Sequence, residues 1–278
     1  ATIRNPISTM KKTDDFLGIL WATAAVGLFS IIYVSGRLTG DVVAPIVIVW
    51  LRYLGGFIAI FLISFAAGKH NSLLETKIGA HFARSSTGSL GTLLILYASS
   101  SMPVVNVTAI GLLDGFFVIF LAVILLAERI VPRTLIAVMG CAVGSLIIIC
   151  DADVAHFHNL ASVSAAVLGA FCLALELVII KHLAATEDRI KTLVWVNGLG
   201  TVTLLAPGLL FIDIAHINYY FLFLLLGPLA LFGQFCNIVS CQYSAAGVIG
   251  ATRYSWIIFA LFWGFFVFDE QISWVDVL

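Results

Sequence analysis

Two long stretches of this sequence contain no Lys, Arg, Asp or Glu, and they limit the possible folds more than any other feature. They span residues 85–113 and 214–252. A helix that crosses the roughly 30 Å hydrocarbon core of a bilayer needs about 20 residues, so the second stretch suits two crossings. Across the chain 62% of residues are hydrophobic and 10% are charged, whereas soluble domains have about 45–50% and about 25%. These features indicate a polytopic membrane protein.

The apolar segments favour helices over the strands of a transmembrane barrel. Segments 16–36 and 192–212 are apolar on nearly every side, whereas barrel strands alternate apolar and polar residues over about ten positions. Apolar stretches bounded by charges and turn residues predict spanning helices at 16–35, 43–67, 85–100, 102–127, 134–150, 161–182, 192–212, 219–241 and 246–268. The chain ends a few residues into a tenth helix that we expect to begin near Ile272.

Basic residues are concentrated in alternate connections between these helices. They precede the first helix and follow the second, fourth and sixth, whereas the opposite connections hold only Arg37. Because basic loops stay in the cytoplasm during insertion, we expect a multi-pass protein of the cytoplasmic (inner) membrane with its N-terminus in the cytoplasm.

Several classes of function lack support in the sequence. The formal net charge is −1 and there is no basic run, so we expect no nucleic-acid partner. The five cysteines show no CxxC spacing, which indicates packing residues and no cofactor or metal. The connection with Asp151, Asp153, His156 and His158 has metal-binding side chains but no further donors, so we expect no metal there either. No Walker A motif is present, hence no ATPase.

The two halves of the chain carry an internal repeat. FFVIFLAVILLAERI at 116–130 corresponds to WIIFALFWGFFVFDEQI at 256–272, and each ends in Glu, one residue, then Ile. These segments are five helices apart, an odd number, so the halves enter the membrane with opposite orientations. We therefore predict two inverted five-helix repeats, 1–150 and 151–278, an arrangement that many secondary transporters use.

Four sets of residues, in this order and spacing, carry a family resemblance. They are Trp21, LRYLGG around Arg52, LYASSSMPVVNVTAI before LLAERI, and GATRYSWIIFA before FFVFDE. The chain resembles the drug/metabolite transporter superfamily, specifically its bacterial ten-helix EamA-type members. The resemblance implies a central cavity lined by both halves and a small polar or amphipathic metabolite as the solute. Relatives often carry a proline near the middle of their fourth helix, where this chain has Gly115.

Four charged residues fall well inside the predicted helices: Arg52, Asp114, Glu176 and Arg253. Each costs roughly 2.5–3.5 kcal/mol at the bilayer centre, so each should face protein or a wet cavity. At about 1.5 Å rise per residue, Asp114 and Arg253 lie at nearly the same depth, and we predict that they pair. The pair is either a substrate or gating site or a structural ion pair that fixes the helix register.

The other two buried charges have open roles. Glu176 is a candidate for proton coupling, because a carboxyl group out of water holds its proton more readily. Pairing with Arg52 or with a cation at headgroup level fits equally well. Arg52 is similar to the arginine that EamA-type relatives tend to carry in their second helix, and we expect it to act as a structural or gating charge packed between helices.

Polar and aromatic residues complete the candidate site. Gln234 and Asn237 share one helix face, as do Asn197 and Thr201, so each pair either bonds a neighbouring helix or lines a cavity. Six aromatic residues either wall the substrate site or pack in the core or the interface belt: Trp21, Tyr33, Tyr97, Phe117, Tyr254 and Trp256.

Two GxxxG spacings allow close helix contacts. Gly111 and Gly115 flank Asp114, while Gly140 and Gly144 lie in segment 134–150. The second spacing suits contact with another helix or with a second protomer in a homodimer.

We therefore predict an all-α polytopic secondary transporter that moves a small solute, such as an amino acid or a related zwitterion, by alternating access. Its partners are the solute, the lipid bilayer and, in a coupled mechanism, protons. The alternatives are a polytopic membrane enzyme or a channel. HExxH, GxSxG and a pair of intramembrane aspartates are all missing from the sequence, as is a recognisable ion filter, and we therefore expect no enzyme.

Overall fold

The computed structural model describes residues 14–38, 42–68, 78–101, 104–128 and 160–268, with a few positions between 132 and 144. Every regular element in these ranges is a helix. Seven of the described segments are long and apolar enough to cross a membrane. Large apolar side chains such as Leu160 and Leu210, each 81% exposed, remain on the outside of the bundle, as contact with lipid requires. The predicted class, an all-α polytopic membrane protein, is confirmed.

The helices follow the predicted order with shifted boundaries. They are α1 (Asp15–Leu38), α2 (Pro45–Ala66), α3 (Ile78–Ser101), α4 (Val104–Gly111), α5 (Leu113–Leu126), α7 (Leu160–Thr186), α8 (Arg189–Leu210), η5 (Ile214–His216), α9 (Ile217–Tyr243), α10 (Ala246–Thr252), η6 (Arg253–Ser255) and α11 (Trp256–Phe268). The predicted tenth helix and most of segment 134–150 lie outside the described residues.

Two of the predicted helices are broken at corresponding places. Segment 102–127 divides at Leu112 into α4 and α5, and segment 246–268 is divided by the short 3-10 turn η6. At the first break the Gly115 amide donates to the Leu112 carbonyl, three residues back, instead of four as in an α-helix. Asp114 follows the first break and Arg253 begins the second.

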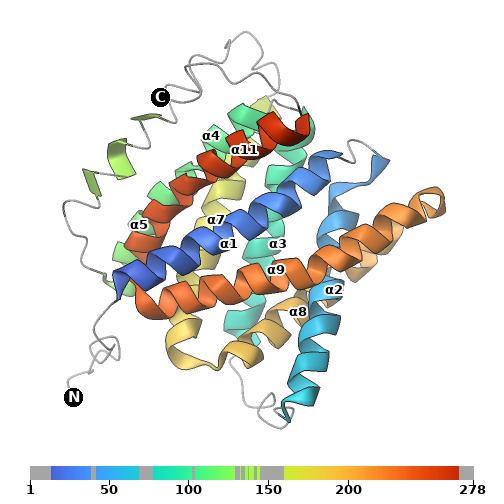
Figure 1. Cartoon of the computed structure of the whole chain (residues 1–278), viewed down its shortest axis with the longest axis horizontal. Coiled ribbons are helices and arrows are strands. Elements are labelled where there is room, and N and C mark those ends of the chain that lie inside the picture. The colour runs from blue at the N-terminus through green and yellow to red at the C-terminus, as the bar shows by residue number, and fades with distance from the viewer. Residues whose placement is uncertain are drawn as a thin grey trace.

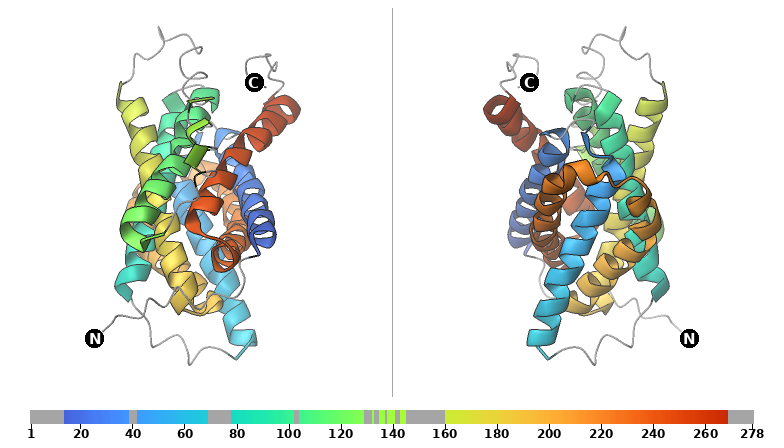
Figure 2. Two further views of the ribbon diagram at one scale, coloured as in Figure 1. Left: turned by 90° about the vertical axis from the view of Figure 1, so that its left-hand side faces the viewer. Right: turned by 90° about the vertical axis from the view of Figure 1, so that its right-hand side faces the viewer.

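The long helices pack side by side in a single bundle (Figure 2). Helix α1 lies along α9, with α3 and α7 behind them (Figure 1). Helix α3 also packs on α7, and α2 contacts both α8 and α9. Helix α5 packs between α7 and α10.

Glycines allow two of the helix crossings to bring backbones together. A Cβ atom at Gly227 of α9 would lie on the backbone of Gly55 and Gly56 in α2. A Cβ atom at Gly115 of α5 would lie 2.9 Å from the carbonyl oxygen of Gly250 in α10. Helix α9 carries Pro228 in its interior and runs as one helix from Ile217 to Tyr243. Gly227 is needed there because α2 leaves no room for a side chain.

We predict that Gly227→Ala lowers the thermal stability of the purified protein. The added methyl group must displace the backbone of α2, and overpacking of this kind costs typically 1–3 kcal/mol. The matched control is Gly79→Ala, because a Cβ atom at Gly79 of α3 would have no other atom within 4 Å. Alanine favours a helix over glycine by roughly 0.5–1 kcal/mol, so Gly79→Ala should leave the Tm equal or higher. Equal melting temperatures for the two variants would contradict the tight α2–α9 contact.

Candidate functional site

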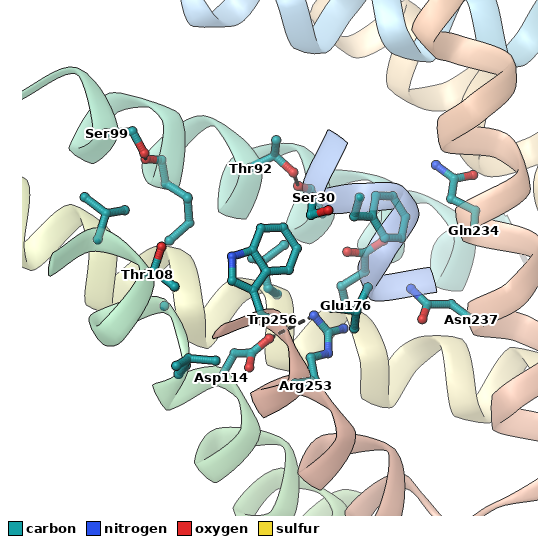
Figure 3. A pocket seen from close by; sticks show the side chains of 18 of the residues that line it. Ser30, Thr92, Ser99, Thr108, Asp114, Glu176, Gln234, Asn237, Arg253 and Trp256 are labelled. Atoms are coloured by element: carbon teal, nitrogen blue, oxygen red, sulfur yellow. Dashed lines mark hydrogen bonds and ion pairs between the residues drawn. The ribbon is translucent and has the colours of Figure 1, made fainter. Parts of the chain in front are cut away.

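A cavity of about 160 Å³ lies between the helices of both halves of the chain. One water molecule needs roughly 10–15 Å³ measured in this way, so the cavity has room for a small organic solute. Its wall combines charged, amide, hydroxyl and aromatic groups (Figure 3). Among the lining residues are Ser30, Arg52, Tyr53, Thr92, Ser99, Thr108, Asp114, Leu173, Glu176, Gln234, Asn237, Arg253, Trp256 and Trp263.

The predicted pair of Asp114 and Arg253 is present in the cavity wall. Arg253 Nη1 donates to Asp114 Oδ2 at 2.8 Å, and the two side chains are 20% and 7% exposed for arginine and aspartate respectively. The two helix breaks and the Gly115–Gly250 contact bring the pair together. The prediction of this pairing is confirmed, and because both residues line the cavity, a charged solute group can compete for either partner.

Glu176 of α7 also reaches the cavity, with its carboxylate over the backbone of α3. A Cβ atom at Gly88 would lie 2.7 Å from its Oε1 atom, so this glycine makes room for the carboxylate. Its nearest cation is Arg84 of α3, with Nε 4.0 Å from Oε1. Pairing with Arg52 within 4.0 Å, one of the sequence alternatives, does not occur among the described residues.

Arg84 is the functional candidate that sequence reasoning missed. The charge pattern groups it with the basic connection after segment 43–67, because the next predicted helix begins at residue 85. Helix α3 instead begins at Ile78, so Arg84 lies within it and is fully buried. The signal that could have found it is the four-residue spacing of Arg84 and Gly88, which puts both on one helix face.

Arg52 lines the cavity, although we expected it to pack between helices. Its guanidinium carbon lies 4.6 Å from the centre of the Tyr53 ring, a distance typical of a cation–π contact. The residue is 6% exposed, and its Nε atom has no hydrogen-bond partner in the described part of the chain.

The predicted amide residues divide between two roles. Asn197 of α8 is buried and donates to Gln234 Oε1 at 2.8 Å, which is the helix-to-helix bond of the two alternatives. Gln234 and Asn237 of α9 both line the cavity (Figure 3). Thr201 donates to the carbonyl of Asn197 within α8.

The predicted aromatic residues are brought together only in part. Trp256 lines the cavity, whereas Trp21 packs edge-on against Phe235, 6.2 Å between ring centres. Tyr97 is 47% exposed on the outside of α3, and Tyr254 is buried against Gly115; neither lines the cavity. The positions of the helices in the sequence do not show which aromatic side chains point into the cavity.

Polar residues of the wall that the sequence did not single out come mainly from α1 and α3. The indole of Trp263 in α11 donates to Ser30 Oγ of α1 at 2.9 Å, and this bond fixes one side of the cavity. Thr92 and Ser99 of α3 donate to their own helix at Gly88 and Ile95. Hydroxyl groups such as these form their hydrogen bonds within one helix. The sequence therefore does not show that they line a cavity.

Three charged residues meet at the turn between α9 and α10, which we call the α9–α10 turn (residues 244–245). Lys181 of α7 donates to the carbonyls of Cys241 and Ser244 at the C-terminal end of α9. It is buried, although its place in the basic connection after segment 161–182 suggests the membrane interface. Glu128 accepts hydrogen bonds from the Ala246 amide at 3.1 Å and the Gly247 amide at 3.4 Å.

These contacts satisfy the backbone groups that helix ends leave unpaired. An anion suits the N-terminus of α10 and a cation suits the C-terminus of α9. Ala127, with φ of 50°, ends α5 in the left-handed conformation, and the Glu128 amide then returns to the Ala122 carbonyl. This cap fixes the backbone from which Glu128 reaches α10. Asp15 of α1 completes the set by accepting from Ser244 Oγ at 3.1 Å.

Metal-binding groups do not gather in the part of the chain that the structure describes: no three His, Cys, Asp or Glu side chains are placed to share an ion. The connection with Asp151, Asp153, His156 and His158 lies outside that part.

We predict that Asp114 and Arg253 are energetically coupled. Asp114→Asn or Arg253→Gln alone leaves an uncompensated buried charge and should cost about 3–5 kcal/mol of unfolding free energy. The double variant removes both charges, so its cost should be well below the sum. Unfolding of the four proteins in detergent measures the coupling, and costs that add within about 0.5 kcal/mol would show that the pair is not coupled. The exposed pair Asp213–His216 serves as control, with an expected coupling below about 1 kcal/mol.

Comparisons with known proteins bear on the family and the fold. Residues 16–150 match the EamA-like transporter family. The pseudopaline exporter CntI of Pseudomonas aeruginosa, from strains UCBPP-PA14 and ATCC 15692, is 25% identical over 256 residues, which cover 91% of this chain and 88% of the relative. One crystal structure of a protein shares the fold, with a TM-score of 0.73 and 15% identity over 94% of this chain and 91% of that chain.

The names of the family and of these relatives describe transport and not an enzyme. They confirm the resemblance that the sequence motifs carry. The chain is a multi-pass membrane protein whose residues 16–150 match the EamA-like transporter family, and these similarities support a membrane transporter of small metabolites.

Proposed function

We propose that this protein is a secondary transporter that carries a small zwitterionic or otherwise charged organic solute across the cytoplasmic membrane by alternating access. The observation that carries the proposal is the cavity, whose wall places the Asp114–Arg253 pair, Glu176 and Arg52 around one space. Charges buried at this depth are expensive in a membrane and mark solute pathways. Aromatic and amide groups between them suit an organic solute better than a bare ion.

The inverted repeat, with halves 1–150 and 151–278, is part of this proposal. A two-fold relation would make α1 equivalent to α7 and α3 equivalent to α9. The contact of α1 with α9 and that of α7 with α3 are then one contact repeated, and both occur. The breaks in segments 102–127 and 246–268, and the family match that ends at residue 150, support the same division.

The orientation follows from the basic connections and assigns a side to each end of the site. With the N-terminus in the cytoplasm, the α9–α10 turn lies at the cytoplasmic end of the bundle. The cavity includes Ser99 near the end of α3 and Trp263 in the second half of α11, both toward the opposite end. We therefore infer an outward-facing state that Asp15, Glu128 and Lys181 close on the cytoplasmic side. The relatives named as exporters favour transport out of the cell.

We predict that the protein in liposomes moves at least one solute from a panel of labelled amino acids, nucleosides and cofactors faster than empty liposomes do. Asp114→Asn and Arg253→Ala should each reduce that flux at least about tenfold, equivalent to roughly 1.4 kcal/mol. Asp213→Asn, an exposed aspartate outside the cavity, is the matched control and should keep the flux.

Each outcome of that assay decides a separate part of the proposal. A panel without any transported solute would remove the transport function, whereas unchanged flux in both variants would remove the site. A proton gradient applied in the same liposomes tests proton coupling through Glu176. Flux that does not respond to the gradient would remove that role and leave uniport or exchange.

We predict that Glu128→Gln opens the cavity to the cytoplasm. The neutral amide loses the charge that suits the N-terminus of α10, and one of the two hydrogen bonds with it. A single cysteine at the Asn237 position, in an otherwise cysteine-free protein in inside-out vesicles, should react several-fold faster with a membrane-impermeant maleimide. Glu187→Gln is the matched control, since Glu187 pairs with Lys191 on the same proposed side away from the α9–α10 turn. The same labelling rate for the two glutamine variants would refute the gate.

A further inference from the structure

The charged groups in the cavity wall and directly behind it include one more arginine than carboxylates. Arg52, Asp114, Glu176 and Arg253 line it, and Arg84 lies directly behind Glu176. An arginine side chain stays protonated in a protein. Two guanidinium groups in the wall and one behind it therefore accompany two carboxylates, and the surplus positive charge lies in a region where an uncompensated charge is costly.

Each of the two carboxylates has an arginine other than Arg52 as its nearest cation. Asp114 holds Arg253 through a hydrogen bond of 2.8 Å. Glu176 has Arg84 as its nearest cation, at 4.0 Å, and the three side-chain nitrogens of Arg84 have no hydrogen-bond partner in the described part of the chain. Arg84 is fully buried and does not line the cavity, so a solute cannot neutralise it in place of Glu176.

Arg52 is therefore the cation that remains for the solute. It lines the cavity, it is 6% exposed, and its Nε atom has no hydrogen-bond partner among the described residues. None of the carboxylates that the structure describes lies within 4.0 Å of its guanidinium nitrogens. The contact with the Tyr53 ring holds the guanidinium group of Arg52 in place. The guanidinium nitrogens then bind best to a planar oxyanion that lies in the plane of the group.

We propose that the transported solute is a net anion with more carboxylates than ammonium groups, and that one carboxylate binds Arg52. This inference rests on the proposed transport function and names the class of its solute. The three arginines and two carboxylates have a net charge of +1, which a solute with a net charge of −1 neutralises. A neutral zwitterion leaves that charge uncompensated. The ammonium group of the same solute meets Glu176, whose side chain remains 18% exposed, and its apolar part meets Trp256 and Leu173.

Matched solute pairs test the proposal directly in the full-length chain in detergent. Each pair exchanges carboxylate for amide: L-glutamate and L-glutamine, L-aspartate and L-asparagine, phenylsuccinate and phenylsuccinamide. A solute that binds the folded state raises the Tm, and the concentration dependence of the shift gives its affinity. We expect at least one carboxylate member to bind about 10- to 100-fold more tightly than its amide, the range for a charged hydrogen bond of 1.5–3 kcal/mol.

Variants assign that preference to one side chain. Arg52→Gln should abolish the carboxylate preference, and Arg52→Lys should keep part of it through the charge alone. Arg189→Gln is the matched control, because the guanidinium of Arg189 also lies over an aromatic ring, Phe235, at 5.7 Å, but outside the cavity. If Arg52→Gln does not fold, the wild-type pairs and Arg52→Lys decide the outcome.

Three results would overturn the inference: equal affinity for carboxylate and amide members, no Tm shift with any carboxylate of the panel, or a preference that survives in Arg52→Gln. Flux of neutral zwitterions in the liposome assay, together with any of these, would keep the transport function and reject only the anionic solute. Absence of all flux would reject the transport function itself.

Discussion

The structure depends on how five charged side chains are neutralised inside a membrane. A lone charge at this depth is costly, so each must meet an opposite charge, a helix end or a solute. Asp114 and Arg253 meet each other at 2.8 Å, and Glu176 meets Arg84. The breaks at Leu112 and at η6 bring the first pair together, and Gly88 makes the room that Glu176 needs. The cavity lies where these groups converge, so the same contacts form the bundle and define its site.

Much of this arrangement could be predicted from the sequence, because membrane insertion constrains depth. Apolar stretches located the helices, and helical rise brought Asp114 and Arg253 to the same depth. The sequence also indicated that Gly115 would lie at a close helix contact, as it does against Gly250. What depth does not determine is the direction in which a side chain points about its helix axis. This explains why Trp21 and Tyr97 lie outside the cavity, and why Arg52 lies in its wall instead of between helices.

The errors at helix ends have another physical cause. The charge pattern assigns Arg84 to a basic connection, because a charge next to an apolar stretch usually marks the membrane boundary. In the structure α3 begins two turns earlier, and a carboxylate on α7 meets the arginine there. The same pattern assigns Lys181 to the interface, but its ammonium group donates hydrogen bonds to the carbonyls at the end of α9. In both cases the interaction partner is far away in the sequence, so a pattern of neighbouring residues cannot predict it.

Helix α10 connects the two ends of the proposed transport pathway. It has only seven residues, about 10 Å of helix, and both of its ends are held by residues from the two ends of α5. Glu128, just after α5, binds its first amides, and Asp114, in the first turn of α5, binds Arg253, the residue directly after α10. The Gly115–Gly250 contact between them leaves little room for α10 to slide along α5. A solute that competes for Asp114 or Arg253 weakens one of these two contacts between α5 and α10. In the proposed transport cycle, the helix would then turn about its glycine contact and move the amides that Glu128 holds at the other end. In that cycle, solute in the cavity is linked to closure at the α9–α10 turn through a single short helix.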